Sequence, residues 1–451
     1  MPPKRNSTLS PVLQAFERCR GSIDESRFAS TVLTLIFLRE TFEQDWAIFR
    51  SHPDDAVWHS GHWEYDRNPL VDITVGSMGD LPYAALMETI DAVESVAGRL
   101  GSESAFQLVL EELGSAREML LTPASVASVL AGTIDLAGAS TVYDPFCRAG
   151  ELLVAAARRT RAESGDGGLA YHGDMPDAKS LAIARMNIRL HQLDGMLEQR
   201  WFGTQASTDK RDYQRPEARR FPRILSNPPF NIRNWNRSGP YYEYWRYGTP
   251  PKGSANFAWL QYAVERLEPG GRAAIVMANS AAFSMNPSEK EIRMRMVEDG
   301  CVEALISLPN ALFRGTSISA TIWLLSPPGS KRDEILFIDA TAAGRLADRT
   351  LRVLSDTEVS EIIQVVSNWR AGRSVHIRGE AITCAAVPLS EISRQDYNLS
   401  HAGFRTRPYT PPSPAEQLPK IQELMARLEV EHAIARDKDA KAMQAVEDTL
   451  P

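Results

Sequence analysis

The chain has 451 residues, of which 43% are hydrophobic and 24% charged, a composition typical of globular proteins rather than disordered ones. Fifty basic residues stand against 57 acidic ones, so the net charge of −7 argues against a protein that binds nucleic acid with its whole surface, although local basic faces remain compatible with it. Four widely separated cysteines without a C-x-x-C pair argue against a disulfide framework and a structural zinc site.

No membrane signal is expected from the N-terminus or from the longest apolar run. The N-terminus has no apolar signal-peptide core, and the longest apolar-rich run, residues 28–38, is too short to cross a bilayer. Together with the cysteine usage, these features predict a cytoplasmic protein without membrane contact.

Residues 1–118 are predicted to form an N-terminal helical domain. Apolar residues recur at spacings of three and four in residues 22–50, and a second helical block covers residues 82–120. The loop-like stretch between these blocks holds His59 and His62 without a third ligand, so no metal site is predicted there.

Strands and helices alternate in residues 119–405, which predicts an α/β catalytic domain with a doubly wound sheet. Thr122 is expected to cap a helix that has Pro123 at its first position. The predicted strands are residues 141–144, 169–173, 197–202, 223–226, 272–277, 302–308, 319–325 and 334–338, and the predicted helices are residues 124–137, 151–161, 177–191, 256–267 and 287–299.

Residues 406–451 are predicted to form a linker and a C-terminal helix. A proline-rich segment precedes a charged helical stretch whose short apolar stripe includes Met425 and Leu428. Such a helix is expected to dock on a partner protein, and a solvated, frayed tail is the alternative.

An acceptor loop, residues 226–231, follows the predicted strand at 223–226. Pro228 and Pro229 cannot donate to a strand ladder, so the strand must end and display the Asn227 side chain and the Pro228 carbonyl at its carboxyl end. Two acceptors beside the Phe230 ring suit a flat base with an exocyclic amine: both N–H groups are held, and the base, flipped from the duplex, stacks on the ring. A strand followed by a proline-stiffened loop is the simpler interpretation.

A donor loop, residues 144–151, lies where a strand turns into a helix. At such a turn the backbone can approach a cofactor, and the helix N-terminus favours a carboxylate. Its sequence runs Asp144-Pro-Phe-Cys-Arg-Ala-Gly150, and this position alone is weak support for a cofactor site.

Aromatic and basic side chains interleave between residues 231 and 252. This composition suits unstacked bases and phosphates, and it is equally typical of a contact between subunits. The residues predicted to bind DNA are Arg233, Trp235, Arg237, Arg246 and Lys252.

In their order along the chain, these motifs resemble the modification (M) subunit of type I restriction–modification systems, an amino-group N6-adenine DNA methyltransferase family. The likeness is carried by Leu121-Thr-Pro, Asp144-Pro-Phe-Cys, Met186-Asn-Ile-Arg-Leu-His191, Ser226-Asn-Pro-Pro-Phe-Asn231 and Ala255-Asn-Phe-Ala-Trp-Leu260. The resemblance implies a Rossmann-like S-adenosylmethionine-dependent methyltransferase sheet, double-stranded DNA as substrate and a separate specificity (S) subunit, with a restriction or translocase subunit as a further potential partner.

The resemblance also implies roles for individual residues. Catalytic roles fall on Asn227, Pro228, Pro229 and Phe230, and S-adenosylmethionine binding falls on Thr122, Asp144, Phe146, Arg148, Gly150 and Asp174.

The departures from the family pattern lie on the donor side. Arg148 and Glu151 replace glycines, so Arg148 either strains the turn, if its φ is positive, or binds the methionine carboxylate. Met175 stands where the family places a ribose-binding glutamate, so Asp174 is expected to substitute, and Thr204 replaces an aspartate that follows the third strand. Donor binding that is weakened, altered or dependent on assembly is therefore expected.

Three functions fit the sequence. The main prediction is a site-specific adenine-N6 DNA methyltransferase subunit. The alternative is a catalytically weakened, methyltransferase-like scaffold that binds DNA and a specificity subunit. Protein glutamine methylation shares the Asn-Pro-Pro motif, but the helical N-terminus and the basic–aromatic segment argue against it.

Overall fold

The structure is a computed structural model. It describes residues 7–43, 46–47, 50, 81, 83–113, 121–165, 168–175, 177–199, 219–233, 245–314, 318–347, 351–373 and 381–401, and scattered helical residues between 422 and 436. The predictions for His59, His62, Thr204, Trp235 and Arg237, and for most of the C-terminal helix, lie outside the described residues.

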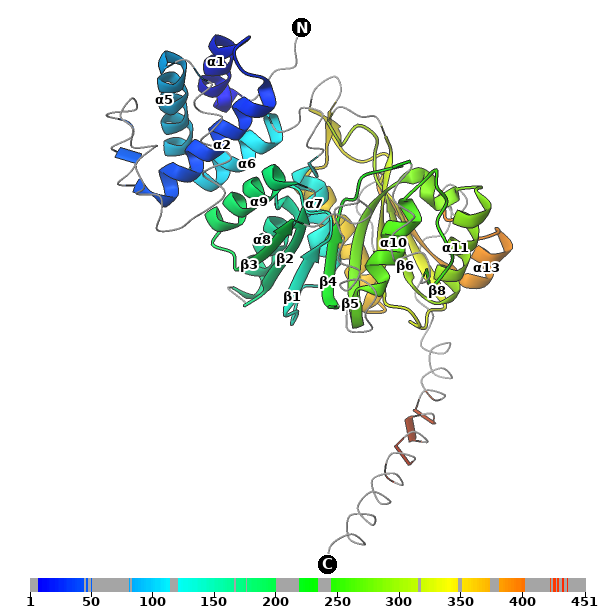
Figure 1. The fold of residues 1–451 in the computed structure, drawn as a ribbon. Coiled ribbons are helices and arrows are strands. Elements are labelled where there is room, and N and C mark those ends of the chain that lie inside the picture. Colours follow the sequence, from blue (N-terminus) through cyan, green and yellow to red (C-terminus); the bar gives the residue numbers. More distant parts are fainter. Residues whose placement is uncertain are drawn as a thin grey trace, which may run out of the picture.

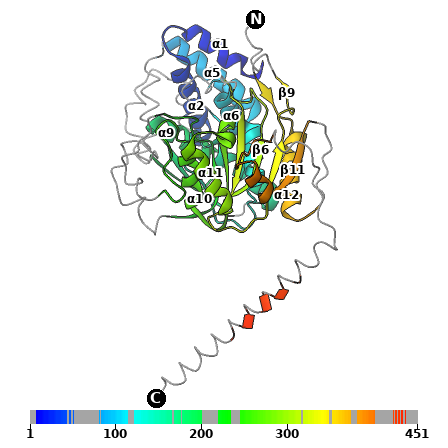
Figure 2. The same cartoon turned by 90° about the vertical axis from the view of Figure 1, so that its right-hand side faces the viewer.

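The N-terminal helices pack around one central helix, α2 (Glu25–Thr41), whose residues 28–38 are all buried. Asp24 caps this helix, since its carboxylate accepts a hydrogen bond from the Arg27 N–H at 2.8 Å, as the acidic start of the predicted helix indicates. Its neighbours are α1 (Ser10–Cys19), α5 (Tyr83–Leu100) and α6 (Ser102–Glu112), and a short 3-10 helix, η1 (Ser7–Leu9), precedes them. In two perpendicular views this group lies above the sheet domain (Figures 1 and 2).

A nine-stranded sheet and the helices that cover it form most of the rest of the described chain, which confirms the α/β class. The strand order is β11-β8-β6-β7-β5-β4-β1-β2-β3, and the strands are parallel except β7 and β11. The strands are β1 (Thr141–Asp144), β2 (Ala170–Met175), β3 (Gly195–Gln199), β4 (Phe221–Ser226), β5 (Leu267–Ala278), β6 (Val302–Ser307), β7 (Ala320–Leu325), β8 (Glu334–Asp339) and β11 (Thr383–Pro388).

Helices cover both faces of the sheet, so β6 and β7 are buried at every position. On one face α7 (Ala124–Thr133), α8 (Glu151–Ser164), α9 (Ala178–Leu190) and α12 (Asp356–Arg370) share a core with the strands. On the other face lie α10 (Asn256–Glu265), α11 (Pro287–Glu298) and α13 (Leu389–Arg394). The smaller elements are η5 (Asn279–Phe283) and the antiparallel pair β9 (Arg345–Leu346) and β10 (Arg352–Val353).

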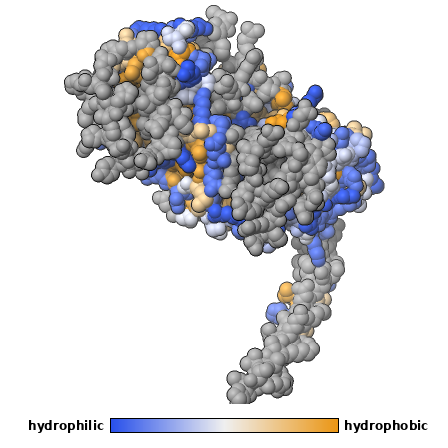
Figure 3. Space-filling model, viewed as in Figure 1, coloured by the Kyte–Doolittle hydropathy of each residue, from blue (hydrophilic) through white to orange (hydrophobic). Residues whose placement is uncertain are grey.

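The outer face of α9 joins the sheet domain to the N-terminal helices. Ala182, Ile183 and Met186 are buried in the same core as α2 and α6. On the face seen in Figure 3, hydrophobic and hydrophilic side chains lie side by side along this junction. No helix among the described residues is long and apolar enough to cross a membrane.

The predicted ends of elements differ most from the structure at α7 and β5, and one predicted helix cap was wrong. The helix predicted to reach residue 137 ends at Thr133, because Asp135 takes a positive φ of 56°. The strand predicted from Arg272 begins at Leu267, because a register shift opposite Phe221 and a φ of +74° at Gly270 keep the turn-like segment within the strand. Thr122 does not cap α7, whose N-cap is Pro123 without a side-chain hydrogen bond.

Candidate active site

The donor and acceptor loops leave neighbouring parallel strands at the same edge of the sheet. Val142 of β1 pairs with Arg223 of β4, so Asp144 and Ser226 end their strands side by side. The Ser226 hydroxyl donates a hydrogen bond to Asp144 Oδ1 at 2.7 Å, and the Phe146 N–H donates to the same oxygen at 3.0 Å. The two loops predicted to hold the cofactor and the base are therefore directly bonded.

The Asn227 side chain is held by Thr122, which the sequence predicted to cap a helix and to bind the cofactor. Its side-chain Nδ2 donates to the Thr122 hydroxyl oxygen at 3.1 Å, and both residues are almost fully buried, with exposed fractions of 5% and 4%. This bond fixes the plane of the amide and turns Oδ1 away from Thr122. Pro228 is also buried, so both predicted acceptor residues lie in the protein interior rather than on its surface.

The rest of the acceptor loop is bound to the first turns of α10. Trp259 Nε1 donates to the Pro229 carbonyl oxygen at 3.1 Å. Asn256 accepts from the Asn231 N–H at 3.1 Å and donates to Asn231 Oδ1 at 2.9 Å, which holds Asn231 at a φ of +53°. The segment that contains Asn256 and Trp259 is part of the family resemblance, but the sequence did not indicate a role for either residue.

Phe230, the predicted stacking residue, is half-buried rather than free on all sides. Its ring meets the Phe313 ring edge to face, with a centroid distance of 6.1 Å. Phe146 of the donor loop meets the Trp259 ring in the same geometry at 4.7 Å. The indole of Trp259 thus contacts both loops.

The donor loop turns at one glycine. Gly150 has a φ of +77° in the left-handed region and is the N-cap of α8. Arg148 is not among the described residues with a positive φ, so its side chain causes no left-handed strain. Burial lowers the pKa of its guanidinium, while the carboxylates of Glu151 and Asp144 oppose that effect.

Glu151 uses both carboxylate oxygens on backbone N–H groups. Oε1 accepts from the Thr122 N–H at 3.0 Å, and Oε2 accepts from the Ala149 N–H at 3.2 Å. From the sequence, Glu151 was recognised only as a glutamate that stands in place of a glycine of the family pattern. A carboxylate at the first position of a helix was the signal that it could bind backbone N–H groups.

Asp144 is fully buried at the end of β1. Burial raises the pKa of its carboxyl group to about 8, although the hydrogen bonds from Ser226 and Phe146 oppose the shift. A carboxyl group of this kind ionises readily when a positive charge arrives next to it.

Asp174 has a partner that the sequence did not indicate. The Tyr143 hydroxyl donates to Asp174 Oδ2 at 2.6 Å and also lies 3.0 Å from the Tyr262 hydroxyl. Side chains alternate along a strand, so Asp174 points to the opposite face from Met175, which is buried in the core with α8. Any role at the Met175 position would therefore require Asp174 to change its orientation.

The described basic residues of the predicted DNA-binding segment differ in their pairing. Arg233 and Lys252 are exposed. Arg246 Nε lies 3.3 Å from Asp299 Oδ2, and its guanidinium carbon lies 5.8 Å from the centroid of the Tyr247 ring. Part of the Arg246 charge is therefore compensated within the protein.

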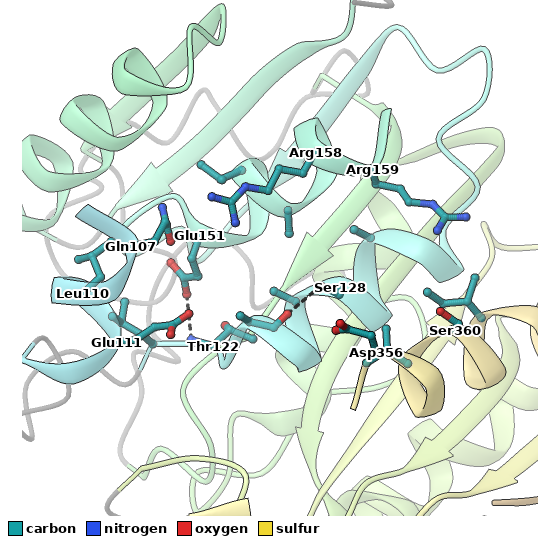
Figure 4. Close-up of a pocket in the computed structure, with 18 residues that line it drawn as sticks. Gln107, Leu110, Glu111, Thr122, Ser128, Glu151, Arg158, Arg159, Asp356 and Ser360 are labelled. Carbon is teal, nitrogen blue, oxygen red and sulfur yellow. Dashed lines mark hydrogen bonds between the residues drawn. The ribbon is translucent and has the colours of Figure 1, made fainter. Parts of the chain in front are cut away.

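Among the described residues, Thr122 lines two cavities whose walls do not include Asn227. One, of about 300 Å³, lies among α6, α7, α8 and α12, with Glu151 and Thr122 on one side and Arg158 and Asp356 on the others (Figure 4). The other, of about 260 Å³, is lined by Thr122, Phe313 and Arg352 among others. The described part of the chain contains no group of three potential metal ligands.

Comparison with known proteins identifies the family. Residues 106–408 match the N-6 DNA Methylase family over about two thirds of the chain. This chain belongs to the N-6 DNA methylase family. Membership identifies the methylase as an adenine-specific DNA methyltransferase of the group that includes type I modification subunits.

Two curated relatives show the range of sequence similarity. The methylase is 30% identical over 326 residues to the type I restriction enzyme HindI methylase subunit of Haemophilus influenzae, and the match covers 71% of each chain. It is 25% identical over 289 residues to the type I restriction enzyme MjaIX methylase subunit of Methanocaldococcus jannaschii, a match that covers 62% of the methylase but only 50% of that relative.

Solved structures share its fold. A type I restriction–modification system methyltransferase subunit from Streptococcus thermophilus superposes with a TM-score of 0.67 at 21% identity, covering 87% of the methylase and 98% of that chain. A protein from Listeria monocytogenes that is assigned as a class I S-adenosylmethionine-dependent methyltransferase reaches a TM-score of 0.53 at 13% identity, covering 81% of the methylase and 99% of that chain. These matches confirm the predicted methyltransferase-type sheet.

Proposed function

We propose that this methylase transfers a methyl group from S-adenosylmethionine to N6 of an adenine flipped out of double-stranded DNA, as the modification subunit that works with a separate specificity subunit. The arrangement of Asn227 carries the proposal. Its amide is fixed by Thr122, precedes the Pro228 carbonyl, and lies one residue from the Ser226–Asp144 bond to the donor loop.

The acceptor loop would activate the adenine amine for attack on the methyl group. The amine nitrogen of adenine is a poor nucleophile because its lone pair is delocalised into the ring. The Asn227 and Pro228 oxygens would each accept one N–H of that amine, which favours tetrahedral geometry and turns the lone pair out of the ring plane. Both oxygens are neutral acceptors, so the proton released after methylation would pass to solvent.

The donor loop fits a cationic donor. When bound, S-adenosylmethionine supplies an electrophilic methyl group on a positively charged sulfur. The buried Asp144 carboxyl, whose pKa is about 8, would ionise next to that charge, and Gly150 leaves the backbone free of a side chain at the turn. Thr122, Phe146, Arg148 and Asp174 remain the other proposed donor-binding residues.

Contact with DNA and with the specificity subunit would involve surfaces outside this centre. Arg233 and Lys252 are exposed and cationic, and with Trp235, Arg237 and Arg246 they form the proposed DNA-binding set. On the C-terminal helix, Met425 and Leu428 are 59% and 62% exposed, which favours a helix that docks on the specificity subunit. A restriction or translocase subunit would join through the same assembly.

An Asn227→Ala variant tests the proposal in the complete assembly with its specificity subunit. Removal of the amide should lower the rate of N6-methyladenine formation by about 10²-fold or more, with DNA affinity within a few-fold of the parent protein. Asn368→Ala, on α12, is the matched control and should methylate normally. Retained methylation by Asn227→Ala would contradict the assignment.

The donor loop supports one alternative, a scaffold that binds DNA and its partner without transferring methyl. Tyr143 engages Asp174, and Glu151 occupies two backbone N–H groups of the donor region, so fewer groups are available to a cofactor. Isothermal titration with S-adenosylmethionine distinguishes the two functions. Saturable binding supports the enzyme, and absence of binding to the complete assembly supports the scaffold.

A further inference from the structure

We infer that Glu151 is a positioning residue for methyl transfer, because its carboxylate holds Thr122 in the place from which the Thr122 hydroxyl holds the Asn227 amide. The inference rests on the proposed function and deepens it. It gives the glutamate that departs from the family pattern a task on the acceptor side of the site.

The first link is a carboxylate shared between two segments. Glu151 Oε1 accepts from the Thr122 N–H and Oε2 from the Ala149 N–H, at 3.0 and 3.2 Å. Bonds of a charged acceptor to backbone N–H groups are stronger than neutral ones. Glu151 is also the first residue of α8, where the helix favours negative charge. The backbone before α7 is thus fastened to the donor loop.

The second link is the hydrogen bond from Asn227 Nδ2 to Thr122 Oγ1 at 3.1 Å. Both residues are almost fully buried, so water has little access to replace either partner. A displacement of the Thr122 backbone would therefore release the amide that is proposed to bind the adenine amine.

The donor loop itself is fixed from the opposite side. Asn187, fully buried on α9, donates from Nδ2 to the Ala149 carbonyl oxygen at 2.7 Å. Its Oδ1 accepts from Gln107 Nε2, on α6, at 2.7 Å. Ala149 is therefore held at both its N–H and its C=O, and Glu151 bridges from this fixed point to Thr122.

This hydrogen-bonded chain makes a prediction that a general loss of stability does not. If Glu151 acts on Asn227 through Thr122, the two residues share one pathway and their effects on kcat are not additive. Glu151→Gln keeps the size of the side chain but leaves one acceptor oxygen and places an NH2 group opposite a backbone N–H. Thr122→Val removes the hydroxyl, and Thr122→Ser keeps it.

The test uses the full-length methylase in its assembly and measures kcat, the KM for S-adenosylmethionine and thermal unfolding. Thr122→Val and Glu151→Gln should each lower kcat by about 10-fold, since small misplacements of reacting groups cost one to two orders of magnitude. The kcat of the double variant should be no lower than the kcat of the less active single variant. Thr122→Ser should stay within about 2-fold of the parent. Glu163→Gln, an exposed glutamate on the same helix, is the control and should be unchanged.

Two results would overturn the inference: kcat losses that multiply in the double variant, or single variants that melt earlier with an unaltered kcat. Failure of the proposed function has a different signature, because the parent assembly would then form no N6-methyladenine at all. An active parent with an unaffected Glu151→Gln variant would refute only the positioning role.

Discussion

The donor and acceptor loops leave neighbouring strands at one edge of the sheet, yet different interactions hold them. The acceptor loop depends on uncharged partners: the Thr122 hydroxyl, the Trp259 indole and the Asn256 amide. The donor loop contains two carboxyl groups and a guanidinium, those of Asp144, Glu151 and Arg148, and the first of these is fully buried. The acceptor loop is therefore held by neutral hydrogen bonds, whereas the donor loop contains ionisable groups.

The difference bears on the predicted departures from the family pattern, which lie on the donor side. A loop held by directed neutral hydrogen bonds tolerates little change, because each lost partner leaves a buried polar group unpaired. A loop that contains opposing charges can exchange two glycines for an arginine and a glutamate whose charges oppose each other. The donor loop should therefore respond to pH directly, and the acceptor loop should respond only through its links to Asp144 and Glu151.

Among the residues that support the acceptor loop, the largest effect is expected from Asn256→Ala on α10. The substitution removes both hydrogen bonds to Asn231 and leaves a positive-φ residue without support. Unfolding free energy should fall by about 1–3 kcal/mol, and the methylation rate by about 10-fold or more, as measured by urea denaturation and methyl-transfer assays. Asn256→Asp keeps the acceptor for the Asn231 N–H and should lose less. Equal losses in both variants would contradict this account of the loop.

On the donor side, Gly150→Ala should destabilise the protein by about 1–2 kcal/mol, the cost of a left-handed conformation for a residue with a Cβ. Arg148 has no positive φ, so Arg148→Gly should bring no stabilisation and should cost about 0.5–1 kcal/mol. Urea denaturation measures the unfolding free energy of both variants. A stabilising Arg148→Gly change would show that the arginine strains the turn after all.

A smaller effect is expected from Trp259→Phe. The phenyl ring keeps the contact with Phe146 but cannot donate to the Pro229 carbonyl oxygen, so unfolding free energy should fall by about 1 kcal/mol. The methylation rate should fall only a few-fold, because Asn256 still holds the loop. A rate loss as large as that of Asn227→Ala would show that Trp259 takes part in methyl transfer and does not only support the loop.

The last prediction concerns Asp144→Asn, which should change the slope of stability with pH. The Asp144 pKa is about 8 in the folded protein and about 4 in the unfolded chain, so between these values only the folded state keeps the proton. Its contribution to stability is therefore present at low pH and is lost as the pH rises toward 8. Stability measured at pH 5, 6, 7 and 8 should fall less steeply in Asp144→Asn. Parallel pH profiles would contradict the burial of a titrating carboxyl at this position.

The sequence revealed the parts of the fold that depend on local pattern. The alternation of strands and helices, the end of β4 at two prolines and the acidic start of α2 all follow from residues close together in the chain. The C-terminal elements α12, β11 and α13 were not predicted, although Ser355 and Glu358 form a readable capping box at the start of α12.

What the sequence could not show are contacts between distant segments. Thr122 looked like a helix cap because it precedes Pro123, whereas its partner lies 105 residues later at Asn227. Asp174 looked available for a ribose, but the Tyr143 hydroxyl binds it across the neighbouring strands. Such pairings are set by the sheet order, which no local pattern encodes.

The most direct measurement of the central claim is a crystal structure of the assembled methylase with a DNA duplex and an unreactive analogue of S-adenosylmethionine. The account predicts an extruded adenine whose N6 lies within hydrogen-bond distance of both Asn227 Oδ1 and the Pro228 carbonyl oxygen, next to the donor loop. An adenine bound elsewhere, or either oxygen turned away from the amine, would contradict it.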